Sequence, residues 1–330
     1  MNQRDDHRRP SRREFLALGL GAFVVAATPG VIRPKRQLVR RSVPLMGTIA
    51  EVGVVHRDQR YAQGAIDAAI AELRSVESTM TRFRDDSDVG RANLQAARGP
   101  VALGSATAGV LAASLAWAER SDGAFDPTIG GAVRLWDVAN RHAPPSDTDV
   151  RRLADRGLYR SLELGRHNGQ DVVLFHEPEI ALDLGGIAKG YGVDRAVAVL
   201  REWGVTDALV NLGGDLYAMG RSATDDEWDV GVRDPDDPNA LAARFSISDH
   251  AVATSGDYHQ YFEHGGQRYH HLLDPSTGAP RRARVRSLTV TADACMSADA
   301  AATAAFGREM AAAQRLVARV DPRATVVHIG

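Results

Sequence analysis

The segment Asp183-Leu184-Gly185-Gly186-Ile187-Ala188-Lys189-Gly190-Tyr191 connects a short apolar stretch to a stretch with helical character. Two glycines between a strand and a helix let another group approach the backbone closely, and the free N–H groups of the helix N-terminus attract an anion. Lys189 lies where its ammonium can meet a phosphate. The spacing matches neither a P-loop nor the dinucleotide-binding fingerprint. The segment therefore predicts either an anion-binding turn or an ordinary tight turn between a strand and a helix.

On either side of this segment, strand-like and helix-like stretches follow one another without regular alternation. Apolar residues at helical spacing predict helices over 62–80, 107–120 and 190–203, and one long helix over 297–317. Short apolar runs between turn residues predict strands over 172–175, 180–182, 208–212, 216–219, 228–232, 288–291 and 324–329. This mixture favours the α+β class over a doubly wound sheet, with one domain over 42–330.

The composition excludes several classes of protein. Of the 330 residues, 44% are hydrophobic and 25% are charged, so the chain is neither collagen-like nor wholly disordered. The formal charge of −2 gives no basic face for nucleic acid. A single cysteine, Cys295, allows no internal disulfide and no thiolate zinc cluster, and we expect it to be a buried small residue.

The N-terminus has the pattern of an export signal. Arg12-Arg13 is followed by Phe15-Leu16 and a short apolar stretch up to Ala27, which is typical of a twin-arginine signal peptide over 1–30. An uncleaved membrane anchor and a chance basic start are the alternatives. The basic, proline-containing stretch 31–41 is predicted to be a linker.

Asp299 and Thr303 stand four residues apart in a predicted helix, so both oxygens lie on one face. A carboxylate and a hydroxyl are hard oxygen ligands that suit Mg²⁺. The alternative is an acid in the first turn that offsets the helix dipole, and from the spacing alone this alternative is favoured.

Two adjacent histidines, His270 and His271, precede an Asp-Pro turn. Side chains alternate along a strand, so at most one of the two points into a given site, as a general base or a phosphate ligand. A structural histidine is an equally good interpretation. The arginines that follow, at 281, 282, 284 and 286, are expected to form a solvated loop, although they could also dock an acidic partner or a phosphate.

Several further short segments contain small residues and one acid, and each alone is explained by turn chemistry. In chain order they are Met46-Gly47-Thr48, 80–83, Gly123-Ala124-Phe125-Asp126-Pro127-Thr128, Asn211-Leu212-Gly213-Gly214-Asp215 and Thr254-Ser255-Gly256-Asp257-Tyr258. Together with 183–191, 270–278 and 298–304, this ordered set resembles the FAD:protein FMN transferase family, also called the ApbE family, over roughly 42–320.

The resemblance implies a single ApbE-like, T-fold-like domain and carries specific roles onto this sequence. The residues implied to contact FAD are Met46, Phe83, Ala124, Phe125, Asp126, Asp183, Lys189 and Leu273. Metal ligands for Mg²⁺ are implied at Asp299, Thr303 and the carbonyl of Gly186, and His271 matches the histidine of the family's HxxDP motif. We expect His271 and Asp299 to be catalytic. Phe83 stands where the family often has tyrosine, so it keeps a stacking surface and lacks a hydroxyl.

The implied activity is Mg²⁺-dependent transfer of the FMN half of FAD to a threonine or serine hydroxyl of a target protein, with release of AMP. An FAD pyrophosphatase and a non-enzymatic FAD-binding carrier are the alternatives. With the export signal, the expected location is the periplasm or the outer face of the membrane. The expected partner is an exported or membrane redox protein, and no nucleic acid.

Overall fold

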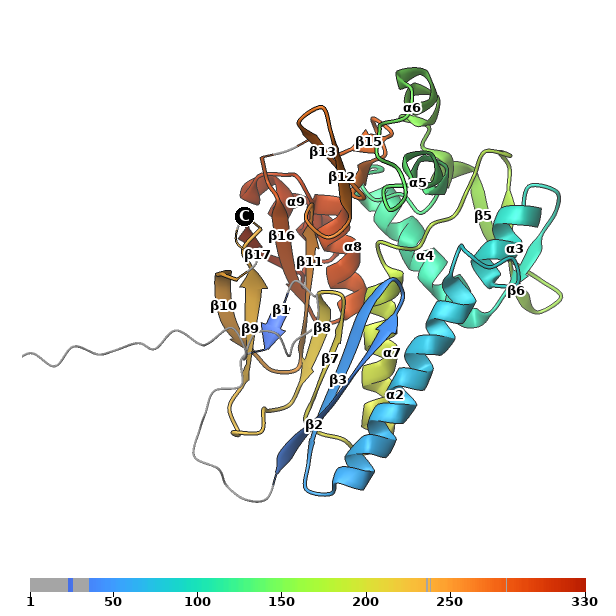
Figure 1. The fold of residues 1–330 in the computed structure, drawn as a ribbon. Coiled ribbons are helices and arrows are strands. Elements are labelled where there is room, and N and C mark those ends of the chain that lie inside the picture. The colour runs from blue at the N-terminus through green and yellow to red at the C-terminus, as the bar shows by residue number, and fades with distance from the viewer. Residues whose placement is uncertain (1–22, 26–35, 236, 238, 283) are drawn as a thin grey trace, which may run out of the picture.

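The computed structural model describes residues 23–25 and 36–330, apart from 236, 238 and 283. A seven-stranded antiparallel sheet lies at its centre, in the order β17-β16-β11-β8-β7-β3-β2 (Figure 1). The strands are β2 (Gln37–Leu45), β3 (Thr48–His56), β7 (Ala208–Leu212), β8 (Asp215–Met219), β11 (His250–Gly256), β16 (Ser287–Ala292) and β17 (Thr325–Ile329).

Helices pack on one face of this sheet. They are α2 (Gln59–Met80), α7 (Ala188–Glu202), α8 (Cys295–Ala305) and α9 (Met310–Val320). In α2, Asp58 caps the N-terminus. The apolar stripe formed by Ile66, Ile70 and Leu73 packs into the main hydrophobic core. The helices predicted over 62–80 and 190–203 are thus confirmed, with ends shifted by a few residues.

A smaller sheet in the order β1-β9-β10 covers the opposite face. Its strands are β1 (Phe23–Val25), β9 (Trp228–Arg233) and β10 (Leu241–Ile247). Trp228, Val230 and Val232 alternate inward along β9 and pack against Leu216 and Val252 of the central sheet. Strands β7 and β8 are therefore buried on both faces, which explains why their sequences are apolar apart from Asn211 and Asp215.

The remaining elements gather beyond one end of the central sheet (Figure 1). The helices are α3 (Asp88–Gln95), α4 (Ser105–Arg120), α5 (Gly130–Trp136), α6 (Asp147–Leu153) and the 3-10 turn η1 (Leu158–Ser161). The strands are β4 (Val101–Leu103), β5 (Leu162–His167), β6 (Gln170–Phe175), β12 (Tyr261–His264), β13 (Gln267–His270), β14 (Leu273–Asp274) and β15 (Ala279–Pro280). The α+β class is confirmed.

The single helix predicted over 297–317 is wrong, because α8 ends at Ala305 and α9 begins at Met310. Gly307 has a φ of +80°, a conformation that ends a helix. The predicted strand over 180–182 is reduced to one bridge between Ala181 and Ile129.

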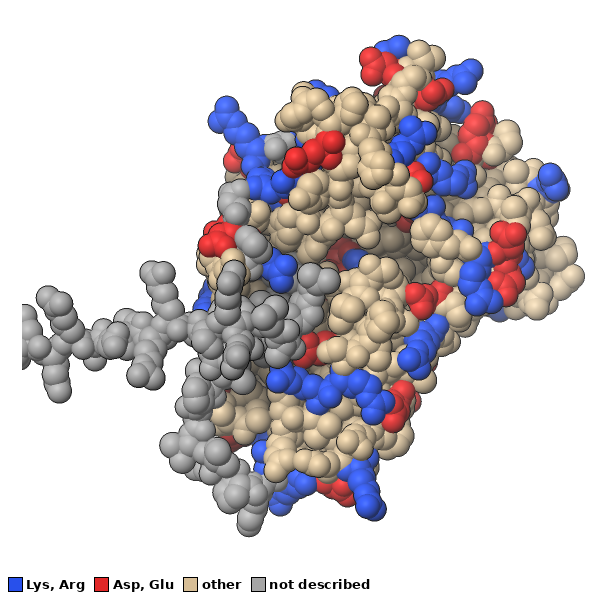
Figure 2. Space-filling view, in the orientation of Figure 1, with Lys and Arg blue, Asp and Glu red and all other residues tan. Residues whose placement is uncertain are grey.

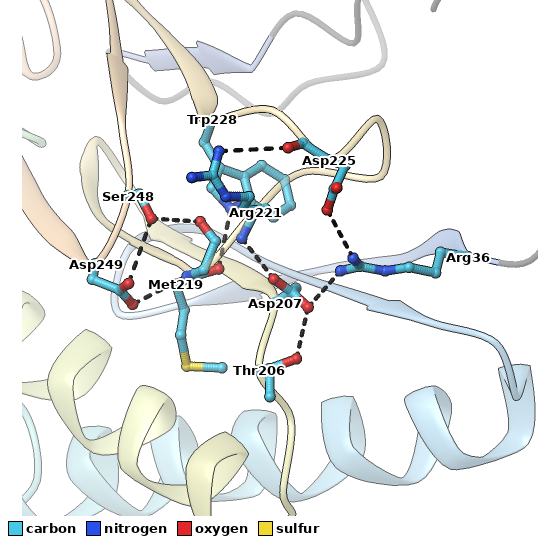
Figure 3. A network of polar contacts seen from close by, with 10 residues as sticks. Arg36, Thr206, Asp207, Met219, Arg221, Asp225, Trp228, Ser248 and Asp249 are labelled. Carbon is cyan, nitrogen blue, oxygen red and sulfur yellow. Dashed lines mark hydrogen bonds and ion pairs between the residues drawn. The ribbon is translucent and has the colours of Figure 1, made fainter. Parts of the chain in front are cut away.

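The predicted linker over 31–41 is also wrong in its second half. Strand β2 begins at Gln37 and pairs with β3 along its whole length, because its residues complete the backbone ladder at the sheet edge. Arg36 is bound by Asp207 and Asp225 at the end of the sheet (Figure 3). The signal peptide predicted over 1–30 lies outside the described residues, except for β1. None of the helices in the described part of the chain has the length and apolar character to cross a membrane.

Candidate active site

Lys189 stands in the first turn of α7 and makes the central contacts of the site. Its Nζ contacts Asp215 at the start of β8 and lies 3.2 Å from both carboxylate oxygens of Asp299 on α8. The backbone N–H of Gly190 donates to Asp299 Oδ2 at 3.0 Å. Both carboxylates have only 4% of their side chains exposed. Two buried acids therefore share one ammonium.

Neighbouring charges in this centre shift the pKa values of Asp215 and Lys189. Burial and the neighbouring charge of Asp299 raise the pKa of Asp215, although Lys189 opposes the shift. Burial alone would lower the pKa of Lys189, but the two carboxylates more than reverse this effect, so Lys189 remains protonated. Asp194 accepts the N–H groups of Cys295 and Met296 at the start of α8, and burial raises its pKa to about 6.

The three expected metal ligands lie together. Thr303 follows Asp299 by one turn of α8, and its hydroxyl makes no hydrogen bond with any described residue. A Cβ at Gly186 would lie 2.9 Å from Thr303 Cγ2 and 3.2 Å from Phe125 Cε2, so only glycine fits between these side chains. The donors are a carboxylate, a hydroxyl and a backbone carbonyl, all hard oxygens that suit Mg²⁺.

These donors fit a divalent cation that keeps other ligands from water or phosphate. Among residues 23–25 and 36–330, less the three gaps, no cluster of three His, Cys, Asp or Glu side chains could hold a metal. A cation at Asp299 would therefore depend on further oxygen ligands, of which the Thr303 hydroxyl lies one helical turn away.

An ion pair and an exposed aromatic ring form one wall of the site. Arg82 Nε lies 2.8 Å from Asp183 Oδ2, and Asp183 Oδ1 accepts the N–H of Gly185 at 2.8 Å. The Arg82 guanidinium lies 4.2 Å from the centre of the Phe83 ring, which is 80% exposed. Asp183 thus fixes the Gly-Gly turn, while Phe83 offers an open face on which a flat ligand can stack.

Met46 lies in the turn between β2 and β3, with a φ of +50°. Its N–H donates to Glu77 Oε1 at 2.6 Å, which fixes the turn to the end of α2. Gly213, in the turn between β7 and β8, donates to the carbonyl of Ile49 at 3.2 Å. The turn of Met46 and the turn before Asp215 are therefore neighbours.

Arg281 is a structural centre that the sequence did not reveal. It was expected in a solvated loop, but its guanidinium is buried and donates to the carbonyls of Ala124, Ala304 and Phe306. Burial lowers its pKa to about 10. Ala124 and Phe125 are thereby held against the C-terminal end of α8. A run of four arginines in the sequence gave no sign of which one would be buried.

Asp126 lies just beyond this anchor, and its Oδ1 accepts the N–H of Thr128 at 2.8 Å. Burial raises the pKa of Asp126. The residue borders a small cavity of about 20 Å³, together with Arg156 and Glu179. A larger cavity of about 310 Å³ lies between α2, α4 and α7 and is lined by none of the predicted site residues.

The two histidines differ as expected from strand alternation. Nε2 of His270 lies 2.9 Å from the carbonyl of Arg281, which makes His270 structural. His271 donates its backbone N–H to the carbonyl of Gln260 at 3.1 Å, and its Nδ1 lies 3.3 Å from the same oxygen. Burial lowers the pKa of His271 to about 4. Leu273, two residues later, is buried beside Trp136.

The structure thus joins most of the predicted residues into a few connected groups. One group consists of Lys189, Asp299, Thr303, Gly186 and Phe125. Asp183 extends this group toward Phe83. Asp215 was an unremarkable turn residue in the sequence, and its position after two glycines was the only available signal. Figure 2 shows the surface hollowed near the middle of this face, with acidic and basic atoms in the hollow. The arrangement suits a phosphate ester bound with a divalent cation.

Comparison with known proteins identifies the family of this chain. The model of the ApbE family matches residues 46–327. The FAD:protein FMN transferase of Treponema pallidum is 36% identical over 81% of this chain and 77% of its own length. The FAD:protein FMN transferase of Vibrio cholerae is 32% identical over 83% of this chain and 82% of its own length. The chain therefore belongs to the ApbE family.

Solved structures agree with this assignment. The crystal structure of the ApbE protein from Thermotoga maritima has a TM-score of 0.78 at 29% identity, and the match covers 89% of this chain and 96% of that one. The flavin transferase ApbE from Vibrio cholerae has a TM-score of 0.72 at 29% identity, over 85% and 91% of the two chains. The expected ApbE-like fold is confirmed.

Proposed function

We propose that this protein is a Mg²⁺-dependent FAD:protein FMN transferase, which moves the FMN half of FAD onto a threonine or serine hydroxyl and releases AMP. Family membership and the names of the relatives support flavin transfer. The observation that carries the metal-dependent step is the charge of the centre. Asp215 and Asp299 are both buried, and among the described residues Lys189 is the one cationic side chain paired with them, so the charge of the site favours one more cation.

Asp299, Thr303 and the Gly186 carbonyl are the residues that would hold Mg²⁺. When bound, the ion supplies positive charge that offsets the charge of the diphosphate during transfer. Lys189 and the N–H of Gly186 hold the phosphates, since both present positive charge to an anion, while the N–H of Gly185 stays bonded to Asp183.

The walls of the site bind the rest of FAD. Phe83 stacks on the flavin, and Arg82 lies against the Phe83 ring. Met46, Asp183 and Leu273 would contact the ligand as well, with Ala124, Phe125 and Asp126 on the segment that Arg281 anchors.

His271 takes the proton from the acceptor hydroxyl. The Gln260 carbonyl faces Nδ1, so Nδ1 carries the proton and Nε2 has a free lone pair. The low pKa keeps the ring neutral at pH 7. As the hydroxyl proton passes to Nε2, its oxygen bonds to the FMN phosphorus. The bond to the AMP phosphate breaks, and AMP leaves with the electron pair.

The proposed setting follows from the N-terminal pattern. A twin-arginine signal would export the protein to the periplasm or the outer face of the membrane. An exported or membrane redox protein with an accessible threonine or serine is the proposed acceptor.

The proposal is tested with the protein, FAD, Mg²⁺ and a candidate acceptor domain, by measuring AMP release and the acceptor mass. The expected result is an acceptor mass gain equal to FMN, with one AMP for each transfer, and loss of both on chelation. AMP without a mass gain in any acceptor tried would indicate an FAD pyrophosphatase instead. Bound FAD with neither product would indicate a carrier.

A further inference from the structure

Three buried polar atoms near the site have no hydrogen-bond partner in the part of the chain that the structure describes: Nε2 of His259, Oη of Tyr258 and Nε of Arg233. Burial of a polar group without a partner costs about 1–3 kcal/mol, and nearly all such groups in native proteins are paired. A set of unpaired atoms in one place therefore points to a partner that binds there.

His259 is adjacent to the segment that pairs with the proposed base. The next residue, Gln260, accepts the backbone N–H of His271 at 3.1 Å. The rings of Tyr258 and His259 lie 4.6 Å apart at an angle of 40°, so Tyr258 limits the orientation of the imidazole. Arg233 is the last residue of β9, in the layer that covers the outer face of the central sheet.

Two cationic side chains act on His259. Burial has the largest effect in lowering its pKa, and the charges of Arg233 and Lys189 lower it further. The nearest acid in the sequence, Asp257, is already paired with Arg268 and Arg286. An unpaired N–H donor with two cationic side chains nearby is complemented by an anion.

We propose that His259 and Arg233 form an anion subsite that binds the diphosphate of FAD together with Lys189. This inference rests on the proposed function and adds two residues to it. Nε2 of His259 and the guanidinium of Arg233 donate hydrogen bonds to phosphate oxygens, and Tyr258 is a positioning residue for the His259 ring. The unpaired donors then gain the partner that the protein alone does not supply.

The test measures the Kd of FAD, by quenching of flavin fluorescence in the presence of Mg²⁺. It compares the full wild-type chain with the variants His259→Ala, His259→Arg and Arg233→Gln. Each of His259→Ala and Arg233→Gln removes a hydrogen bond to a charged phosphate. Each variant should therefore raise the Kd of FAD about tenfold or more. His259→Arg supplies a charged N–H donor in place of the neutral imidazole N–H and should stay within about threefold of the wild type. His250→Ala, at a half-exposed histidine beside Asp293, is the matched control and should leave the Kd unchanged.

The outcomes separate this inference from the proposed function. In turnover, His259→Ala should raise KM for FAD and leave KM for the acceptor unchanged. An unchanged Kd for FAD in both His259→Ala and Arg233→Gln would overturn the subsite, as would a loss that His259→Arg fails to restore. If only KM for the acceptor rises, the subsite is also refuted. Failure of the wild type to bind FAD would instead refute the proposed function itself.

Discussion

The two ends of the β7–β8 hairpin each carry a polar network, and the networks differ in how their charges are balanced. Asp207 precedes β7 and accepts hydrogen bonds from Arg36, Thr206 Oγ1 and the N–H of Arg221 (Figure 3). Asp215, at the other end, shares Lys189 with Asp299 and forms an ion pair with no other cationic side chain among the described residues.

This difference separates a structural network from a functional one. At Asp207, the carboxylate is neutralised by Arg36, and both Arg36 and Asp225 are partly exposed to solvent. This network therefore stabilises the end of the sheet and leaves no buried charge unpaired. At Asp215, two carboxylates are buried around one ammonium, which is costly for folding unless a further cation binds. Local rules of charge pairing are thus broken where a ligand is expected.

The largest expected effect is at the metal ligands. Asp299→Ala should reduce AMP release by about a thousandfold or more, because metal charge stabilisation worth several kcal/mol is lost. Asp207→Ala, at the opposite end of the same hairpin, should retain activity within about twofold. Comparable losses in both variants would show that the two networks do not differ in function.

Lys189→Met should destabilise the protein by about 3 kcal/mol, because two buried carboxylates lose their common partner. Adding Asp215→Asn should recover most of that stability while activity stays low. Urea unfolding of the wild type, both single variants and the double variant gives the coupling energy. A double variant no more stable than Lys189→Met would contradict a shared ammonium.

Arg281→Met should cost about 2–3 kcal/mol of stability, since four backbone carbonyls lose a charged donor. It should also weaken FAD binding, because Ala124 and Phe125 lose their anchor. Arg282→Met, at an exposed neighbour, should change stability by less than about 0.5 kcal/mol. Thermal or urea unfolding of both variants checks the contrast, and equal effects would reassign Arg281 to the solvated loop.

The pH dependence of stability should depend on His271. Its pKa is about 4 in the folded protein and 6.5 in its unperturbed form, so the unfolded state binds more protons between these values. The contribution of His271 to stability is therefore lost as the pH falls from 6.5 to 4. Urea unfolding at several pH values should show a shallower acid loss in His271→Gln. A parallel pH dependence in both proteins would contradict a buried neutral imidazole.

The smallest effect is expected at the structural end of the hairpin. Arg36→Ala should lower stability by about 1 kcal/mol or less, because partly exposed ion pairs contribute little. Turnover should be unchanged. A large loss of activity would mean that the two ends of the hairpin are coupled.

The parts of the fold that the sequence predicted are those with a local signal. The apolar stripe of α2 and the buried runs of β7 and β8 follow from spacing alone. The break between α8 and α9 at Gly307 was missed because alanine-rich sequence continues across both helices. The start of β2 was missed because its half-exposed edge position leaves no clear apolar alternation.

The site divides in the same way. The spacing of Asp299 and Thr303 indicated one helix face, and the resemblance to the family assigned the metal to it. The partners of Lys189 and the burial of Arg281 depend on contacts between segments far apart in the chain, which no local pattern contains. Asp215 and Arg281 therefore needed the structure.

The most direct test of the central claim is divalent cation binding, with Mn²⁺ as the probe and electron paramagnetic resonance as the readout, in the presence of FAD. The account predicts one bound Mn²⁺ per wild-type chain, displaced by Mg²⁺. It also predicts weaker binding in Thr303→Val and binding unchanged from the wild type in Asp207→Asn. Equal Mn²⁺ binding by the wild type and Thr303→Val, or no binding by either, would contradict it.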